Sequence, residues 1–326
     1  MNLNTCMGPL VSSLLIGVAA IGCQAVHAAY PDKTIRVVVP TSAGTPIDLV
    51  TRIVTTRMSK DLGQAIIVDN KVGATGTVGG QEVLRSPADG YTLMTVFMPM
   101  TVAPALLKNV PFDLRKDFVS VGQTVWSYNV LVTHPSVAAR TPGELIAILK
   151  AQPGKLSFPS GGVGTPAHLA GELFKLEADV SALHVPYNQF GQAIGDLVGG
   201  THQFMFAASA PIVPFIETNR LNALAVTGTK RIKALPQVPT LLELGFNNLV
   251  IRDWQGLMVR SSTPPDIVAR LSASITVALA DPAVQQSLAT LGVDPAGGSA
   301  AELSALVDSE IKRWAELVKL QGLKAD

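Results

Sequence analysis

Residues 40–49 read PTSAGTPIDL, and residues 159–169 read PSGGVGTPAHL. Each segment follows a strand-like apolar run and has the same order: proline, a loop of small residues, Gly-Thr-Pro and a helical pattern. Threonine is a favourable N-cap and proline a favourable first helical residue, so each segment predicts a helix start at the carboxyl end of a strand. The two segments are about 120 residues apart, roughly one small domain. We therefore predict two similar lobes.

Strand and helix patterns alternate on both sides of these segments. Strands are predicted at 35–39, 65–69, 92–96, 156–158, 182–185, 203–206 and 223–226. Helices are predicted at 46–61 and 141–150, and three more begin near residues 263, 281 and 299. Two of these starts, Thr141-Pro-Gly-Glu144 and Ser299-Ala-Ala-Glu302, are capping boxes. The alternation predicts an α/β fold with parallel sheets that helices cover on both faces.

The composition indicates a folded, nearly neutral protein. Of 326 residues, 48% are hydrophobic and 15% are charged, which excludes a disordered chain, and the length is enough for two domains. The formal net charge of +1 argues against nucleic acid as a partner, because proteins that bind nucleic acid normally carry a basic face. Any anion site must therefore be local.

Residues 1–28 are predicted to be a signal peptide, which implies a periplasmic protein. They contain no charged residue, and an apolar stretch too short for a comfortable membrane span leads to the small-x-Ala pattern Val26-His27-Ala28. The usual basic residue before the apolar stretch is missing. An anchor helix and lipidation at Cys23 are the alternatives, although Ala20 is a poor match for a lipidation signal. Because Cys6 and Cys23 both lie in this leader, the mature chain has no disulfide, thiolate metal site or cysteine nucleophile.

The two loops have the chemistry of an anion site. A helix N-terminus carries unpaired N–H groups and about half a positive elementary charge, so a loop of small residues there can hold a carboxylate or phosphate without a basic side chain. Neither loop contains Lys or Arg. Either loop taken alone could be an ordinary strand-to-helix turn instead of an anion site. Because the same pattern occurs twice, we favour two loops that share one binding cleft. The predicted ligand-binding residues are Ser42, Ala43, Gly44, Thr45, Ser160, Gly161, Gly164 and Thr165.

The first turns of the two helices carry one polar residue each. Asp48 is predicted to brace its loop by accepting N–H bonds, since its charge would repel an anionic ligand. His168 is predicted to pack, to brace its loop or to make a polar contact to the ligand. Phe97 and Met98 follow the strand at 92–96 and are predicted to form an apolar wall for the ligand body.

Signals for catalysis, metals and cofactors are weak. No G-x-S-x-G, H-E-x-x-H or Walker pattern is present, and the histidines lack metal-ligand spacing. Ser160 with His168 is conceivable as a nucleophile and base. Residues 162–167 match G-x-G-x-x-A, but the acidic residue expected at the end of the next strand is absent. We therefore predict no catalytic residue, no metal and no cofactor.

A series of short motifs in one order resembles the Bug family of extracytoplasmic solute receptors, the binding proteins of tripartite tricarboxylate transporters. The likeness runs from Tyr30 to the end of the chain. It is carried by residues 30–40, 44–48, 89–93, 116–118, 153–156, 164–169, 184–187, 224–227, 235–240 and 254–257.

The resemblance implies a periplasmic-binding-protein-like, Venus-flytrap fold with two lobes joined by two crossover strands. Placing the crossings near Trp126, Tyr128 and Trp254 gives one lobe from 29–125 plus 253–326 and another from 126–252. It also implies a monomer that closes on a carboxylate held by backbone groups of both loops and then docks on a membrane permease. The alternatives are an enzyme, hydrolase or nucleotide-dependent, that uses the same cleft, and a sensor with a signalling partner.

Departures from the family pattern bear on the ligand. Ala207 is also predicted to line the ligand site. It stands where the family often has an acidic residue, so an ammonium group has no obvious partner. Asn188 stands where the family often has a basic residue, which weakens the binding of a second carboxylate. We therefore favour a monocarboxylate with an apolar or aromatic body over amino acids and tricarboxylates.

Overall fold

The computed structural model describes Met1 and residues 30–323 of the chain. The predicted signal peptide, with Cys23, lies outside the described residues. The strands are β1 (Ile35–Val39), β2 (Ile66–Asn70), β3 (Thr92–Phe97), β4 (Phe118–Thr133), β5 (Ser157–Ser160), β6 (Leu183–Pro186), β7 (Phe204–Ala208), β8 (Asn222–Val226), β9 (Arg252–Arg260) and β10 (Val293–Pro295).

The helices begin where the capping signals predict. They are α1 (Pro46–Leu62), α2 (Thr77–Arg85), α3 (Met98–Leu106), α4 (Pro142–Ala151), α5 (Pro166–Ala178), α6 (Phe190–Val198), α7 (Ser209–Glu217), α8 (Pro265–Ala280), α9 (Pro282–Thr290) and α10 (Ala300–Gln321), with short 3-10 helices η1 (Ala74–Gly76) and η2 (Asn247–Leu249). Both predicted capping boxes are formed, at the starts of α4 and α10. Within residues 30–323 no single helix meets the length and hydropathy of a membrane span; α8 and α9, bent by 73°, do so only as a pair.

One lobe is built on a sheet with strand order β10-β4-β9-β3-β1-β2. Side chains alternate across this sheet, as strand geometry requires. Ile35 and Val37 belong to a core formed with α1 and α8, whereas Val38 belongs to a core that includes side chains of α3 and α10. The sheet is therefore covered on both faces, as expected from the sequence.

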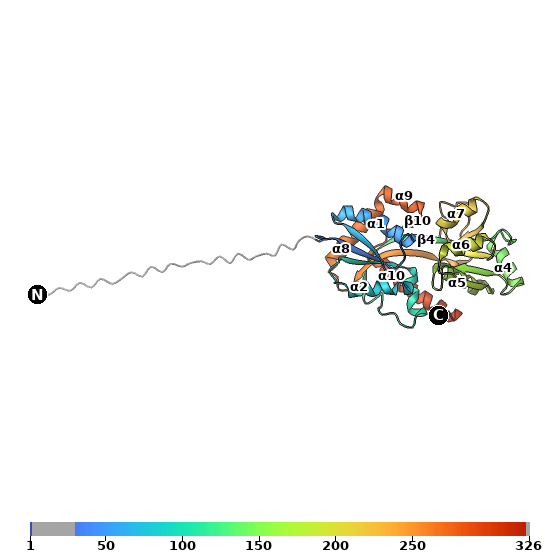
Figure 1. The fold of residues 1–326 in the computed structure, drawn as a ribbon, viewed down its shortest axis with the longest axis horizontal. Coiled ribbons are helices and arrows are strands. Elements are labelled where there is room, and N and C mark those ends of the chain that lie inside the picture. The colour runs from blue at the N-terminus through green and yellow to red at the C-terminus, as the bar shows by residue number, and fades with distance from the viewer. Residues whose placement is uncertain (2–29, 324–326) are drawn as a thin grey trace.

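The second lobe forms around the far half of β4. Residues 129–133 of β4 pair with β7 and β8, whereas residues 118–128 pair with β9. The parallel pair β5–β6 continues this lobe beside β7, where Gln203 N–H donates to the Ser157 carbonyl at 3.2 Å. Figure 1 shows the result, with blue, cyan and orange elements in one lobe and green to yellow elements in the other. The predicted two-lobed α/β fold with crossover strands is confirmed.

The crossover strands also account for an error in the predicted topology. β1 pairs in parallel with β2 and β3, and β5 pairs in parallel with β6, but every pairing of β4 and β9 is antiparallel. The prediction of parallel sheets is therefore confirmed for β1, β2, β3, β5 and β6 and wrong for the crossover strands, because strands that cross between lobes need not follow the strand-helix-strand rule. On these strands Trp126 lies opposite Trp254 and Ser127 lies opposite Asp253. The tryptophans near which the crossings are predicted therefore pair directly with each other.

The packing of α5 against β5 generates a stability test. A methyl group at Gly171 would overlap the ring of buried Phe158, whereas a methyl group at Gly195 in α6 meets nothing within 4 Å. We expect Gly171→Ala to lower the free energy of unfolding by about 1–3 kcal/mol through overpacking. Gly195→Ala should raise it by about 0.5–1 kcal/mol, because alanine is the better helix former. Denaturant unfolding of both variants measures this, and equal effects would contradict the packing described for α5.

Candidate functional site

The first loop ends in the cap of α1. Thr45 is the N-cap; its hydroxyl accepts a hydrogen bond from Asp48 N–H at 3.4 Å and donates to the Ser42 carbonyl at 2.9 Å. Gly44 has φ = +80°, a left-handed conformation that favours glycine. Ser42, Ala43 and Gly44 are exposed. The loop therefore presents backbone to solvent at the start of a helix.

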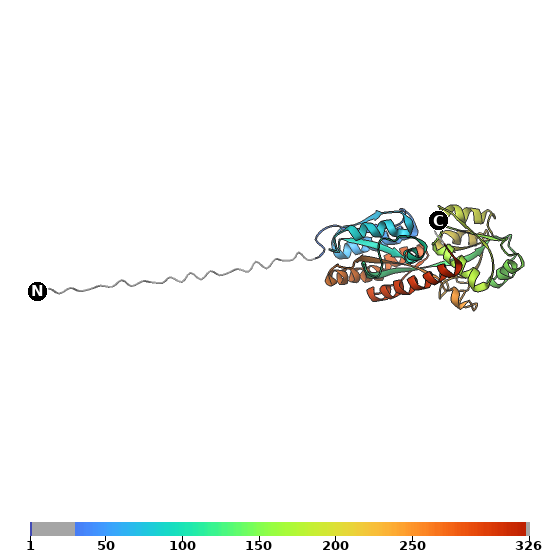
Figure 2. The same cartoon turned by 90° about the horizontal axis from the view of Figure 1, so that it is seen from below.

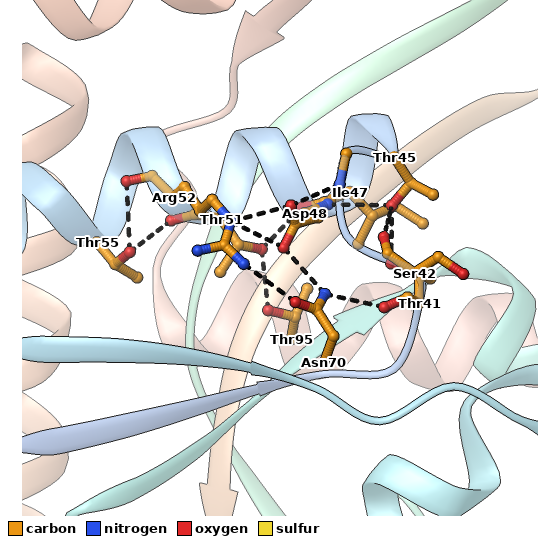
Figure 3. Close-up of polar contacts among 11 residues, drawn as sticks. Thr41, Ser42, Thr45, Ile47, Asp48, Thr51, Arg52, Thr55, Asn70 and Thr95 are labelled. Atoms are coloured by element: carbon orange, nitrogen blue, oxygen red, sulfur yellow. Dashed lines mark hydrogen bonds and ion pairs between the residues drawn. The ribbon is translucent and has the colours of Figure 1, made fainter.

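Asp48 lies in the first turn of α1 beside this loop and holds it by hydrogen bonds, as Figure 3 shows. Its buried carboxylate accepts from Gly44 N–H at 2.9 Å and from Arg52 Nε at 2.9 and 3.0 Å. Asn70 at the end of β2 donates to the carboxylate and to the Thr41 carbonyl, both at 2.9 Å. Burial alone would raise the pKa of Asp48, but these donors outweigh it and lower the pKa. Asp48 is thus an ionised carboxylate whose charge Arg52 neutralises, and it links α1, β2 and the loop.

The second loop has the same backbone plan. Gly164 also has φ = +80°, and its N–H donates to His168 Nδ1 at 3.1 Å, just as Gly44 donates to Asp48. Thr165, the N-cap of α5, donates from its hydroxyl to the Gly162 carbonyl at 2.7 Å. The recurrence in the sequence therefore corresponds to a recurrence in geometry, with a carboxylate in one lobe replaced by an imidazole in the other.

His168 is a buried, neutral brace. Burial first, and then His184 and Lys175, lower its pKa to about 3. Its ring stacks on His184 with centroids 4.1 Å apart, and burial followed by Lys175 lowers the pKa of His184 to about 4. Because Nδ1 accepts from Gly164 N–H, that nitrogen carries no proton. Of the roles expected for His168, the structure thus places it as a brace of its loop.

Ser160 does not pair with His168. Its buried hydroxyl lies 2.7 Å from His184 Nε2 and also bonds Gly162 at both the N–H and the carbonyl. The nucleophile and base considered from the sequence, Ser160 with His168, are therefore not assembled. Within residues 30–323 no group of three or more His, Cys, Asp or Glu side chains could hold a metal ion.

The two loops differ in their free donors and in their neighbours. The Thr165 side chain makes no cap bond to α5, so the N–H groups of its first turn, including Ala167, lack partners within the helix. A Cβ on Gly164 would lie 2.8 Å from Leu106 at the end of α3, and one on Gly161 would lie 3.2 Å from Phe190. Because α3 belongs to the other lobe, the second loop lies where the lobes meet.

Other predicted site residues lie deeper in the fold. Phe97 ends β3 with 5% of its surface exposed, and Met98 is fully buried as the first residue of α3, so both contribute to the core. Ala207 is buried on β7, where it pairs with Val130. Sequence reasoning missed the partners of Asp48: Arg52 lies four residues along the same helix, which is a spacing that predicts an ion pair, but Asn70 comes from another strand.

Comparison with known proteins places this geometry in a family. A family profile described as "Tripartite tricarboxylate transporter family receptor" matches residues 50–323. The chain is 32% identical to "Protein BugT" of Bordetella pertussis over 316 residues, which covers 96% of this chain and 97% of that protein. It is 36% identical to "UPF0065 protein in tcbD-tcbE intergenic region" of Pseudomonas sp. strain P51 over 299 residues, covering 91% and 89%.

Solved structures show the same likeness. "Structure of periplasmic binding protein BugD" has a TM-score of 0.78 at 31% identity, covering 91% of this chain and 100% of that one. "R. palustris Rpa4515 with adipate" has a TM-score of 0.80 at 27% identity, with the same coverage. "MatC (Rpa3494) from Rhodopseudomonas palustris with bound malate" has a TM-score of 0.77 at 29% identity, covering 89% and 100%. The resemblance seen in the sequence is confirmed: the chain belongs to the tripartite tricarboxylate transporter receptor family, which includes the Bug periplasmic solute-binding proteins.

Proposed function

We propose that this chain is a periplasmic receptor that binds a small carboxylate between its lobes and delivers it to a tripartite tricarboxylate transporter. One observation carries the proposal: Gly44 and Gly164 have the same φ of +80° and donate to the same position of the helix that follows. Solved relatives bound to adipate and malate support a carboxylate as the ligand.

The braces explain how loops without basic side chains hold an anion. Asp48 and His168 each engage one loop amide and so fix the direction of the remaining amides before the ligand arrives, which reduces the entropy cost of binding. Each helix start adds its positive dipole end. Arg52 neutralises Asp48 and burial keeps His168 neutral, so neither brace repels or competes for the carboxylate. The proposed contacts are the free N–H and hydroxyl groups of residues 42–45, 160–165 and the first turn of α5.

The finer ligand class remains our proposal. A monocarboxylate with an apolar body suits two loops that contain no Lys or Arg, because a second carboxylate finds no cation in either loop. Exposed Asn188 and buried Ala207 supply no charge beside them. We also propose export through residues 1–28, action as a monomer, and lobes that divide at the crossing near Trp126 and Trp254. The carboxylate class of the solved relatives gives no support to an enzyme in this cleft.

A thermal-shift screen of carboxylates, combined with Gly164→Val, tests the proposed site. A carboxylate at a hundredfold excess over its Kd should stabilise the wild-type protein by about 2.7 kcal/mol. Valine at residue 164 strains a left-handed backbone and lies within 2.8 Å of Leu106, so the variant should lose this ligand-induced shift.

The matched control is Gly63→Val, at the carboxyl end of α1 and away from both loops. Gly63 also has positive φ and nothing within 4 Å, so its variant should lose stability but keep the full ligand shift. If Gly164→Val is too unstable to measure, Gly164→Ala repeats the test with one methyl group. Stabilisation by nucleotides instead of carboxylates, or an undiminished shift in the residue 164 variants, would refute the proposed site.

The buried, neutral His168 predicts how the free energy of unfolding depends on pH. Because the folded pKa of His168 is about 3 and its ordinary value is 6.5, the unfolded chain binds more protons between these values. Stability must therefore fall as pH decreases from about 6.5 towards 3. His168→Asn keeps an acceptor for Gly164 N–H but cannot titrate, so its melting temperature should fall less steeply over this range. Parallel curves for variant and wild type would show that His168 is not a buried neutral group.

A further inference from the structure

A second cavity lies apart from the glycine loops, where α10 meets α5 and η2. Its volume of about 530 Å³ is within the range of small-molecule sites. It contains none of the residues proposed for the cleft, and its walls include Trp126 on β4, Arg252 on β9 and Trp314 on α10. Because α10 packs on β4 and α3 whereas α5 packs on β7, the cavity is built by both lobes. Figure 2 shows α10, in red, along the lower side of its own lobe, with its end at the other lobe.

Arg252 is the cavity residue whose guanidinium has no side-chain hydrogen bond or ion pair among the described residues. Its guanidinium lies over the Trp126 ring, 3.9 Å from the centroid. Among the described residues no carboxylate forms an ion pair with it and no side-chain hydrogen bond engages it, although the residue is only partly exposed. A guanidinium has five N–H donors in a plane that matches a carboxylate. Arg252 therefore has donors available on the open side of Trp126.

The other charged groups of the cavity are already engaged. Arg313 donates to the Val250 carbonyl at 2.8 Å and lies 3.9 Å from Glu310. Glu310 accepts from Trp314 Nε1 at 2.7 Å, and burial raises its pKa against the opposing effect of Trp314, Arg313 and Arg252. At the rim, exposed Glu177 accepts from the Asn248 amide at 2.7 Å, and exposed Glu316 faces solvent. Arg252 acts on Glu310 through charge alone, and among the described residues no side-chain acceptor binds its guanidinium N–H groups.

We propose that this cavity is a second binding site, for a carboxylate carried on an aromatic or branched apolar body. The carboxylate pairs with Arg252, and the body lies against Trp126 and the exposed Leu176 of α5. The site lies outside the interlobe cleft and does not depend on the function proposed there. An occupant touches both lobes, so it stabilises the lobe arrangement in which the cavity is formed.

Intrinsic tryptophan fluorescence tests the proposal, since Trp126 lines the cavity and is partly exposed, whereas Trp254 and Trp314 are fully buried. We expect 4-phenylbutyrate to give a saturable change in emission, and the neutral 4-phenylbutan-1-ol to give a much weaker one. Arg252→Met keeps an apolar chain on Trp126 and should weaken 4-phenylbutyrate at least about tenfold, the loss expected for one charged hydrogen-bonded pair.

A second pair of variants keeps the test independent of folding. Leu176→Asp places a negative charge at the cavity wall and should also weaken binding, whereas Leu183→Asp, at a more exposed leucine on β6, should not. Gly164→Val, which removes the cleft site of the proposed function, should leave this fluorescence response in place. The proposal is overturned if the acid and the alcohol respond alike, if Arg252→Met and Leu176→Asp bind as wild type, or if Gly164→Val abolishes the response.

Discussion

The structure depends on one backbone arrangement that occurs twice: a glycine with positive φ whose amide is held by the first turn of the helix that follows. Only glycine adopts this conformation without strain, and the Thr-Pro pair after it starts the helix at a fixed residue. The hydrogen bond to Asp48 or His168 then turns a loop of small residues into a fixed set of donors. A site of this kind needs no basic side chain, which agrees with the near-zero net charge of the chain.

The two copies are equal in geometry but not in charge. In one lobe the acceptor is a carboxylate neutralised by Arg52, and in the other it is an imidazole kept neutral by burial. Both arrangements satisfy the glycine amide without adding net charge to the loop. β4 and β9 join the lobes as paired antiparallel strands. The cavity at Arg252 lies beside this crossing, since Trp126 of β4 and Arg252 of β9 line it.

Much of the fold could be predicted because its signals are local. Capping boxes at Thr141 and Ser299 and the Thr-Pro starts of α1 and α5 placed helices to within a residue or two. Local pattern did not assign the residues of the crossover strands β4 and β9, which only the family resemblance implied, because their partners are more than a hundred residues away for much of their length. Phe97 was expected at a ligand wall, but α3 follows it at once and the ring packs into the core. The brace at Asp48 followed from its place in the first turn, whereas the contacts of Asn70 and His184 depend on tertiary structure that no local pattern encodes.

The most direct measurement is a crystal structure of the receptor with a carboxylate ligand found by the screen. The account predicts the carboxyl group between residues 42–45 and 160–165, within hydrogen-bond distance of backbone N–H groups from both loops, with Asp48 and His168 still holding Gly44 and Gly164. A carboxyl group bound elsewhere in the cleft by a basic side chain, or loops that face away from each other in the closed form, would contradict it.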